Sequence, residues 1–126
     1  MNPSDSGTQI GASDCFALLA RVGVGRLVFT RHALPDVLPV RFHVDASAAD
    51  DPLPPLIVPA PPGSPHVGGI DGNVIALHAD EIDSGTGAGP SVVVHGRARL
   101  TLDGTAIRLV PELVRGRLLA AGPAAG

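Results

Sequence analysis

The sequence predicts a small β-barrel of about six antiparallel strands with one short helix near the N-terminus. Residues 91–102 alternate between an apolar face and a largely polar face, which is typical of a half-buried strand. Clusters of Gly and Pro recur between the apolar stretches and indicate turns. Helical spacing of apolar residues occurs in residues 13–23. A chain of 126 residues can form one domain with a modest core.

The predicted helix follows a tail over residues 1–12, which is rich in Gly, Ser and Asn and is expected to be flexible. Ser13 is the expected N-cap, and Gly23 is the expected end of the helix. The expected apolar stripe consists of Phe16, Leu19 and Ala20. Cys15, within this helix, is interpreted as a small buried thiol, because no adjacent base would activate it.

Two strands are predicted next, at Val24–Arg31 and Val37–Val44, with a turn over His32–Asp36. Pro39 cannot donate a ladder hydrogen bond, so the second strand is expected at an edge or interrupted there. A short apolar strand is expected at Leu56–Val58. The proline- and glycine-rich residues 59–72 are expected to have little regular structure. On the second strand the residues expected to face the same way are Leu38, Val40, Phe42 and Val44.

A long hairpin is predicted over residues 73–102, with its turn in residues 84–90. The predicted register pairs Ala79 with Val94, Leu77 with Gly96 and Ile75 with Ala98. The same register sets His78 opposite His95 and Ala76 opposite Arg97. A slip by one residue would turn half of the apolar side chains toward water.

The end of the chain is predicted from a tight Asp103-Gly104 turn and an ambiguous segment over residues 105–120. Pro111 and Gly116 argue against a helix there, so one bent strand or two short strands are expected. Residues 120–126 are expected to be a flexible tail. The single domain is therefore expected to span residues 13–119.

Composition excludes several classes of function. A formal net charge of −3 gives no electrostatic reason to expect nucleic acid. The single cysteine forbids an internal disulfide, no signal peptide is evident, and no apolar stretch approaches the ~20 residues that cross a bilayer. A cytoplasmic protein without membrane partners is expected. Val37 and Val93, which are apolar on otherwise polar strand faces, predict a homodimer that covers them.

Several stretches resemble the pyridoxamine 5′-phosphate oxidase-like flavin-binding split barrels. SDCFALLARVGVGRLVF (13–29) is similar to their opening helix and first strand, and VLPVRFHVD (37–45) to their second strand. NVIALHADEID (73–83) followed by SVVVHGRARL (91–100) resembles their central hairpin, and LVPELVRGRLL (109–119) their closing strand. The resemblance covers residues 13–119 in order, and implies a split β-barrel that forms a homodimer with flavin mononucleotide (FMN) in clefts between the subunits.

The resemblance also implies cofactor-binding positions. The flavin phosphate would lie at the segment that includes Pro59, Ala60, Gly63, Ser64 and Pro65. Family members usually carry Arg, Thr and Lys at three of these positions, where this chain has Pro59, Ala60 and Pro65.

Arg41 is the expected replacement cation, and the flavin ring would lie along the second strand at Val40. Arg97 and Arg99, or an arginine of a second subunit, are further candidates for the missing cations. The substitutions leave two further interpretations open, a barrel that has lost its cofactor and acts as an interaction module, and a barrel that holds a deazaflavin or haem.

Other polar groups support only plain interpretations. The histidines lack compact metal-ligand spacing, so surface or interface positions are expected, without a metal site. Asp80, Glu81 and Asp83 are expected to form a solvated turn, and Ser91 shows no recognisable nucleophile arrangement. No catalytic residue can be assigned, and an FMN-dependent oxidoreductase is the preferred function.

Overall fold

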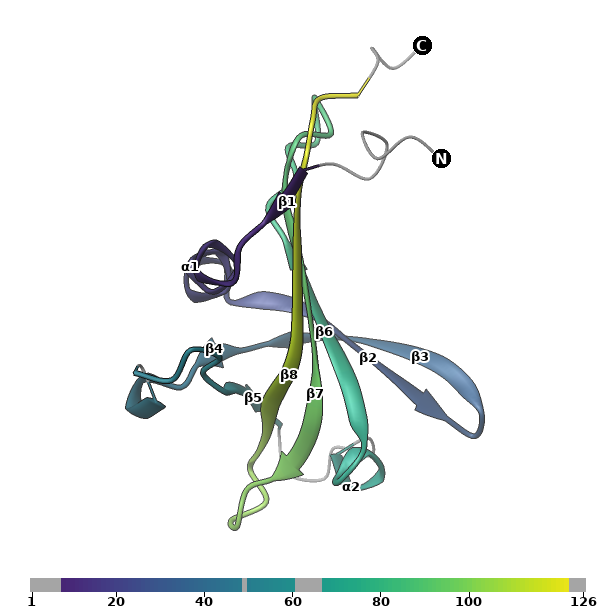
Figure 1. The fold of residues 1–126 in the computed structure, drawn as a ribbon. Coiled ribbons are helices and arrows are strands. Elements are labelled where there is room, and N and C mark those ends of the chain that lie inside the picture. The colour runs from purple at the N-terminus through teal and green to yellow at the C-terminus, as the bar shows by residue number, and fades with distance from the viewer. Residues whose placement is uncertain (1–7, 49, 61–66, 123–126) are drawn as a thin grey trace.

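The computed structural model describes residues 8–48, 50–60 and 67–122 (Figure 1). Its elements in chain order are β1 (Thr8–Ile10), α1 (Ala12–Val22), β2 (Val24–Arg31), β3 (Leu34–Arg41), β4 (His43–Val44), a 3₁₀ turn (Ala46–Ala48), β5 (Leu56–Pro59), α2 (Val67–Ile70), β6 (Val74–Asp80), β7 (Gly89–Leu100) and β8 (Ala106–Leu119). No helix in these ranges is both long and apolar enough to span a lipid bilayer.

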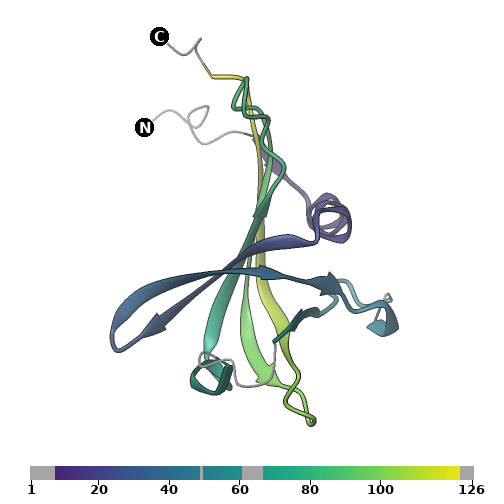
Figure 2. The same ribbon diagram turned by 180° about the vertical axis from the view of Figure 1, so that it is seen from behind.

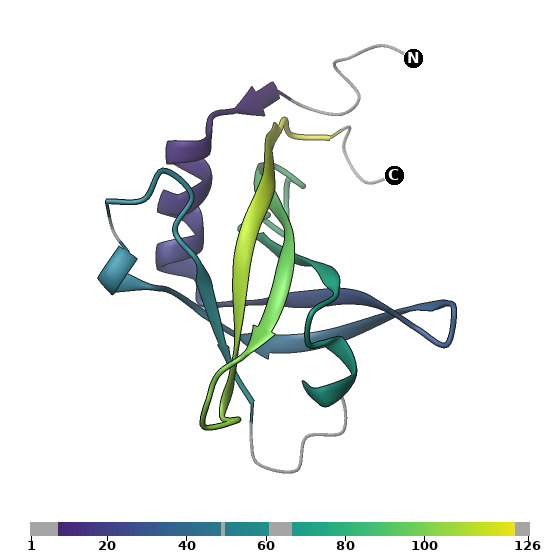
Figure 3. The same cartoon turned by 60° about the horizontal axis from the view of Figure 1, so that its bottom comes forward.

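All strands belong to one antiparallel sheet in the order β3-β2-β6-β7-β8-β5-β4, and β1 pairs with the far end of β8. The sheet curls into a partly open barrel, and α1 lies along its inner side (Figure 3). The predicted split barrel with one N-terminal helix is confirmed. The described residues form eight strands, more than the expected six, because β1 and β4 were not anticipated.

The start of the chain differs from the sequence prediction. The expected flexible tail over residues 1–12 is wrong for Thr8–Ile10, which pair with Gly116–Leu118 as β1. The N-cap is Gly11, not Ser13, and the Gly11 carbonyl accepts a hydrogen bond from the Cys15 N–H at 3.0 Å. Because β1 pairs with β8 as far as Ile10, the chain enters the helix at Ala12. The helix therefore begins before Ser13, and Ser13 cannot be its N-cap.

The other end of α1 agrees with the prediction, because Gly23 adopts the left-handed conformation (φ 71°) that ends helices. The buried face was misjudged. Cys15, Leu18 and Leu19 are buried, whereas Ala20 is exposed and Phe16 is only partly buried. The plain interpretation of Cys15 as a buried thiol is confirmed.

The β2–β3 hairpin projects beyond the rest of the sheet (Figure 2). β2 has the predicted bounds, but only His32 and Ala33 form the turn, with the positive φ values that two-residue hairpins require (52° and 64°). Pro39 lies on an edge strand, as predicted. The strand expected to reach Val44 is interrupted at Phe42, whose side chain is 4% exposed in the core and whose N–H donates to the Gly23 carbonyl.

The β6–β7 hairpin forms where predicted, but its register differs by two residues. Ala79 pairs with Val92, Leu77 with Val94 and Ile75 with Gly96. His78 therefore faces Val93 and not His95, and Ala76 faces His95 and not Arg97. A two-residue slip keeps each side chain on the same face of the sheet, so the alternation pattern could not detect this error.

β8 is the single bent strand that was one of the two options. Its bend coincides with a bulge, because His95 pairs with Leu113 and Gly96 with Pro111, which leaves Glu112 unpaired. The predicted tight turn at Asp103-Gly104 is present, with a positive φ (72°) at Gly104. The predicted strand at residues 56–58 is confirmed as β5, and α2 adds one helical turn where little structure was expected.

The core lies between α1 and the inner face of the curled sheet. It contains fully buried leucines and valines from six elements, and no buried charged residue occurs in the described part of the chain. A side chain at Gly116 would overlap the Cys15 thiol and Ile10, so this glycine allows α1 and β1 to approach β8 closely. The core is accordingly built mainly from aliphatic side chains, with Phe29 and Phe42 as its buried aromatic residues.

Candidate functional site

The outer face of the sheet is the face directed away from α1, and it carries both exposed apolar and basic side chains. The pairing of β3, β2, β6, β7 and β8 aligns one residue from each strand in a row across this face. In that order the residues are Val37, Val28, Ala76, His95 and Leu113. Large apolar side chains that are 41–54% exposed on this face are Val24, Val37, Val74, Val110 and Leu113. This face is therefore more apolar than the solvated side of an antiparallel sheet usually is.

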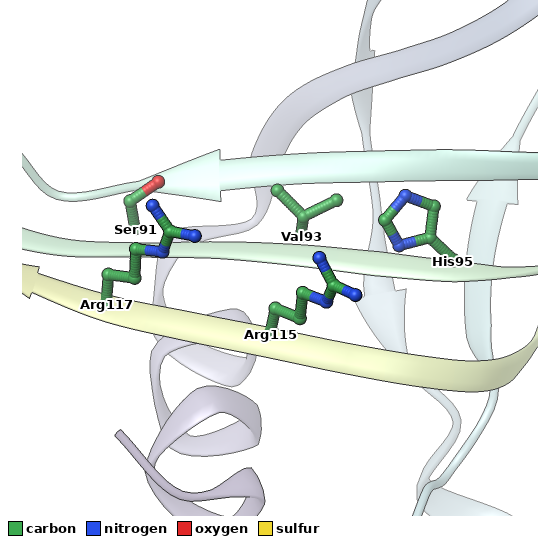
Figure 4. Close-up of a pocket in the computed structure, with 5 residues that line it drawn as sticks. All are labelled: Ser91, Val93, His95, Arg115 and Arg117. Carbon is green, nitrogen blue, oxygen red and sulfur yellow. The ribbon is translucent and has the colours of Figure 1, made fainter. Parts of the chain in front are cut away.

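A groove of about 380 Å³ lies on this face along β7 and β8 (Figure 4). Ser91, Val93 and His95 line it from β7, and Arg115 and Arg117 line it from β8. Ser91 pairs with Arg117 and Val93 with Arg115, so the two guanidinium groups extend over β7 beside these partners. We call this feature the β7–β8 groove.

The charges of the groove are unbalanced. Neither Arg115 nor Arg117 has a hydrogen bond or ion pair within the part of the chain that the structure describes. The acidic side chains nearby are engaged elsewhere, since Asp80 lies 3.4 Å from His78 Nε2 and Glu112 lies 3.9 Å from Arg97 Nε. The groove therefore presents two free cations on adjacent outward positions of one strand.

His95 adds an unsatisfied polar atom at one end of the groove. Its Nδ1 is buried and has no hydrogen-bond partner among the described residues. Burying an unpaired polar atom costs about 1–3 kcal/mol, so such atoms are uncommon in folded proteins.

Beside the groove, Ser91, His78 and Asp80 lie close together, which was not predicted from the sequence. Ser91 Oγ lies 3.1 Å from His78 Nε2, and Asp80 Oδ2 lies 3.4 Å from the same nitrogen. In a serine–histidine–aspartate triad the acid holds the other ring nitrogen, which orients the imidazole as a base. The expectation that Ser91 has no nucleophile arrangement thus agrees with the geometry, because both partners compete for one nitrogen.

The remaining polar residues have structural roles. The Arg21 guanidinium contacts Glu81 at 3.1 Å and holds the pKa of that carboxyl below its usual range. Asp83 accepts backbone hydrogen bonds from Gly85 and Thr86 in the loop. Within residues 8–48, 50–60 and 67–122, no three His, Cys, Asp or Glu side chains come close enough to hold a metal.

The predicted cofactor residues fall into three groups. Arg41 is exposed on the outer face opposite Val24, and Val40, on the other face of β3, packs against the core. Pro59 is exposed at the end of β5, but Ala60 is buried and its N–H donates to the Thr105 carbonyl at 2.8 Å. Ala60 therefore offers a ligand no free amide, and Gly63, Ser64 and Pro65 lie outside the described residues.

β3 and β5 are in contact, so Arg41 and Pro59 belong to the same end of the sheet. Of the other candidate cations, Arg97 donates to the Gly72 carbonyl, whereas Arg99 is exposed on the outer face. The structure thus keeps Arg41 as a candidate ligand and removes the Ala60 backbone from the set.

A sequence model described as pyridoxamine 5′-phosphate oxidase matches residues 11–123. The chain belongs to the pyridoxamine 5′-phosphate oxidase family. No curated protein sequence matches it.

Solved structures with the same fold share low sequence identity with this family member. An FAD-binding protein from Mycobacterium smegmatis is 27% identical over 88% of this chain and 96% of its own, with a TM-score of 0.74. An FAD-binding protein from Mesorhizobium loti is 20% identical over 87% and 94%, with a TM-score of 0.68. An FAD and heme binding protein from Mycobacterium smegmatis is 13% identical over 94% and 77%, with a TM-score of 0.73.

Sequence reasoning missed Arg115 and Arg117. Both lie in the segment whose secondary structure was ambiguous, so the face they occupy could not be assigned. The signal was the Arg-Gly-Arg spacing, which places two cations two residues apart on one face of a strand. That signal becomes informative only with the β7–β8 register, which sets these arginines opposite Val93 and Ser91.

Proposed function

We propose that the chain is a flavin-binding protein that acts as an oxidoreductase in a homodimer. The observation that carries this proposal is the family match over residues 11–123, together with the 27% identical FAD-binding protein from Mycobacterium smegmatis. FMN is the cofactor that the sequence resemblance implies, and FAD is the cofactor in the name of that neighbour. A bound flavin supplies the electron transfer, and the protein supplies binding, orientation and exclusion of water.

The outer face fits such a ligand. A flavin ring is flat and largely apolar, and the row formed by Val37, Val28 and Ala76 is flat, apolar and partly exposed. Arg41 and Arg26 lie on the same face and can contact polar edges of the ring or its phosphate. These residues would hold the cofactor and leave the redox step to it.

The homodimer follows from the same surface. Side chains such as Val37 and Leu113, 52% and 43% exposed, expose apolar area on a face that the described chain does not cover. A second copy related by a two-fold axis would place the same surface opposite itself. The ring would then lie between two outer faces, shielded from water on both sides.

Flavin binding can be tested on purified protein. We expect FMN or FAD added at ~100 μM to be bound with quenched fluorescence, because even a site with a Kd of ~10⁻⁴ M would be about half filled. Arg41→Ala should weaken binding, and Arg31→Ala, at the turn end of the same β2–β3 hairpin, is the control. Absence of binding by wild-type protein to both flavins would contradict the proposed function.

A second candidate function is an interaction module without cofactor. It is favoured by Pro59 and Pro65, which stand where the resemblance implies Arg and Lys, and by the Ala60 N–H, which already donates to the Thr105 carbonyl. A folded dimer that binds neither flavin would support this alternative.

A further inference from the structure

We infer that the β7–β8 groove binds the phosphate group of a flavin nucleotide, through Arg115, Arg117 and Ser91. The inference deepens the proposed function and rests on it for the identity of the ligand. The position is distinct from the segment around Gly63 and Ser64, where the sequence resemblance would place the phosphate. It supplies the cations that Pro59 and Pro65 cannot provide.

Arg115 and Arg117 supply the positive charge of the groove. They project from the same face of β8, two residues apart, which separates their backbone positions by about 7 Å. Both side chains are exposed and extend over β7 (Figure 4). A guanidinium presents a fork of N–H donors that matches the oxygens of a phosphate, and two forks at this spacing can grip one phosphate or a diphosphate.

The lining between the arginines completes a phosphate site. Ser91 Oγ is paired with His78 Nε2 and, as a hydroxyl, keeps further capacity to donate or accept a hydrogen bond. His95 lines the other end of the groove. Val93 forms the floor between them and provides apolar contact for the non-phosphate part of a ligand.

The surrounding charges favour an anion. Asp80 is the acidic residue in register with Ser91, and its carboxylate lies against His78. Glu112 projects from the bulge toward Arg97 at 3.9 Å. Gln9 of β1, which pairs with Arg117, is uncharged. Within the described residues, therefore, no acidic side chain pairs with Arg115 or Arg117. The nearby carboxylates of Asp80 and Glu112 contact His78 and Arg97 instead.

The experiment compares ligands that differ in phosphate. Riboflavin has no phosphate, FMN has one, and FAD has a diphosphate, and affinities for all three are measured by fluorescence quenching. We expect FMN or FAD to bind at least about tenfold more tightly than riboflavin, since a charge-assisted hydrogen bond contributes roughly a tenfold to hundredfold factor. Inorganic phosphate should compete, and added salt should weaken nucleotide binding.

Variants then locate the phosphate. Arg115→Ala and Arg117→Ala should each weaken FMN binding by about tenfold or more and leave riboflavin affinity unchanged. Arg31→Ala, at an exposed arginine beside the turn of the β2–β3 hairpin and outside the groove, should change neither affinity. Arg117→Lys should recover only part of the loss, because lysine lacks the planar fork. Circular dichroism verifies that each variant is folded.

Backbone amide chemical shifts of the wild type give a readout that needs no variant. Inorganic phosphate should shift the amides of Ser91, Val93 and Arg117 and leave those of the distant His32 turn unchanged.

The possible outcomes separate the two proposals. Equal affinity for FMN in wild type and both alanine variants would overturn the groove and leave flavin binding intact. Phosphate binding that depends on Arg115 and Arg117, without any flavin binding, would support the groove and overturn the proposed function. Absence of both phosphate and flavin binding would overturn both.

Discussion

The inner and outer faces of the same strands differ in what covers them. On β8, Leu109 is 0% exposed and its neighbour Val110 is 41% exposed, although both side chains are aliphatic. Leu109 contributes to a core that α1 closes, whereas Val110 lies on the face that the described chain leaves open. Burial of a side chain on these strands therefore depends on whether another layer packs against its face of the sheet. The outer face exposes apolar side chains of the kind that usually pack against a second layer.

The largest expected effect concerns the covered face. Leu109→Ala should lower the free energy of unfolding by about 2–5 kcal/mol, because it leaves a cavity in a close-packed core. Val110→Ala, one residue away, should cost no more than about 0.5 kcal/mol in the isolated chain. Urea unfolding monitored by circular dichroism measures both. Equal losses for the two variants at low protein concentration would break the contrast between the faces.

The next effect concerns the open face. Val37→Asp should convert a species with the mass of two chains into one with the mass of one chain at micromolar concentration, because a buried unpaired carboxylate is costly. Leu34→Asp, 68% exposed at the tip of the β2–β3 hairpin, is the control and should leave the mass unchanged. Sedimentation velocity gives the masses. A wild-type protein that already has the mass of one chain would end the dimer proposal.

A smaller effect is expected where α1 meets β8. Gly116→Ala should destabilise the protein by about 1–3 kcal/mol, because the added methyl overlaps the Cys15 thiol and Ile10. The same substitution should cost less in a Cys15→Ala background, which removes one of the overlapping atoms. Gly69→Ala, where no atom lies within 4 Å of the added methyl, is the control. Thermal unfolding of the four variants and the wild type gives the coupling between positions 15 and 116.

The smallest effect is a pH dependence at the turn between β7 and β8. Hydrogen bonds from Thr101 and Thr105 lower the pKa of Asp103 from 3.8 to about 2. A carboxyl whose pKa is lowered by folding stabilises the fold above its unfolded pKa and loses that contribution as pH falls through the folded value. Wild type should therefore exceed Asp103→Asn in stability at neutral pH, and the difference should shrink between about pH 4 and pH 2. A difference that does not change with pH would contradict this assignment.

Local sequence patterns correctly predicted the elements that depend on interactions between neighbouring residues. The bounds of β2, the end of α1 at Gly23 and the Asp103-Gly104 turn depend on a few neighbouring residues, and these predictions are confirmed. The β6–β7 register and the break at Phe42 depend on packing between distant segments, and both were misjudged. Alternation defines a face but cannot distinguish registers that differ by two residues.

The candidate site shows the same limit. Arg41 was correctly placed on a polar strand face by its alternation with Val40, and the structure confirms that orientation. Arg115 and Arg117 became recognisable only when pairing with β7 set them beside Ser91 and Val93. A site built across strands depends on register, which is the property that a single sequence specifies least.

The edge strand β3 also has features that oppose aggregation through strand pairing. Antiparallel pairing from the His32-Ala33 turn directs the amides of Pro35, Val37 and Pro39 away from β2, toward the free edge. The two prolines have no N–H, and the Val37 N–H donates to Asp36 Oδ1 at 2.9 Å. Three successive positions therefore offer no donor to an incoming strand, which blocks ladder growth of the kind that leads to fibrils. Copies of the chain can therefore associate through the outer face of the sheet, which exposes several valines, without polymerising through the β3 edge.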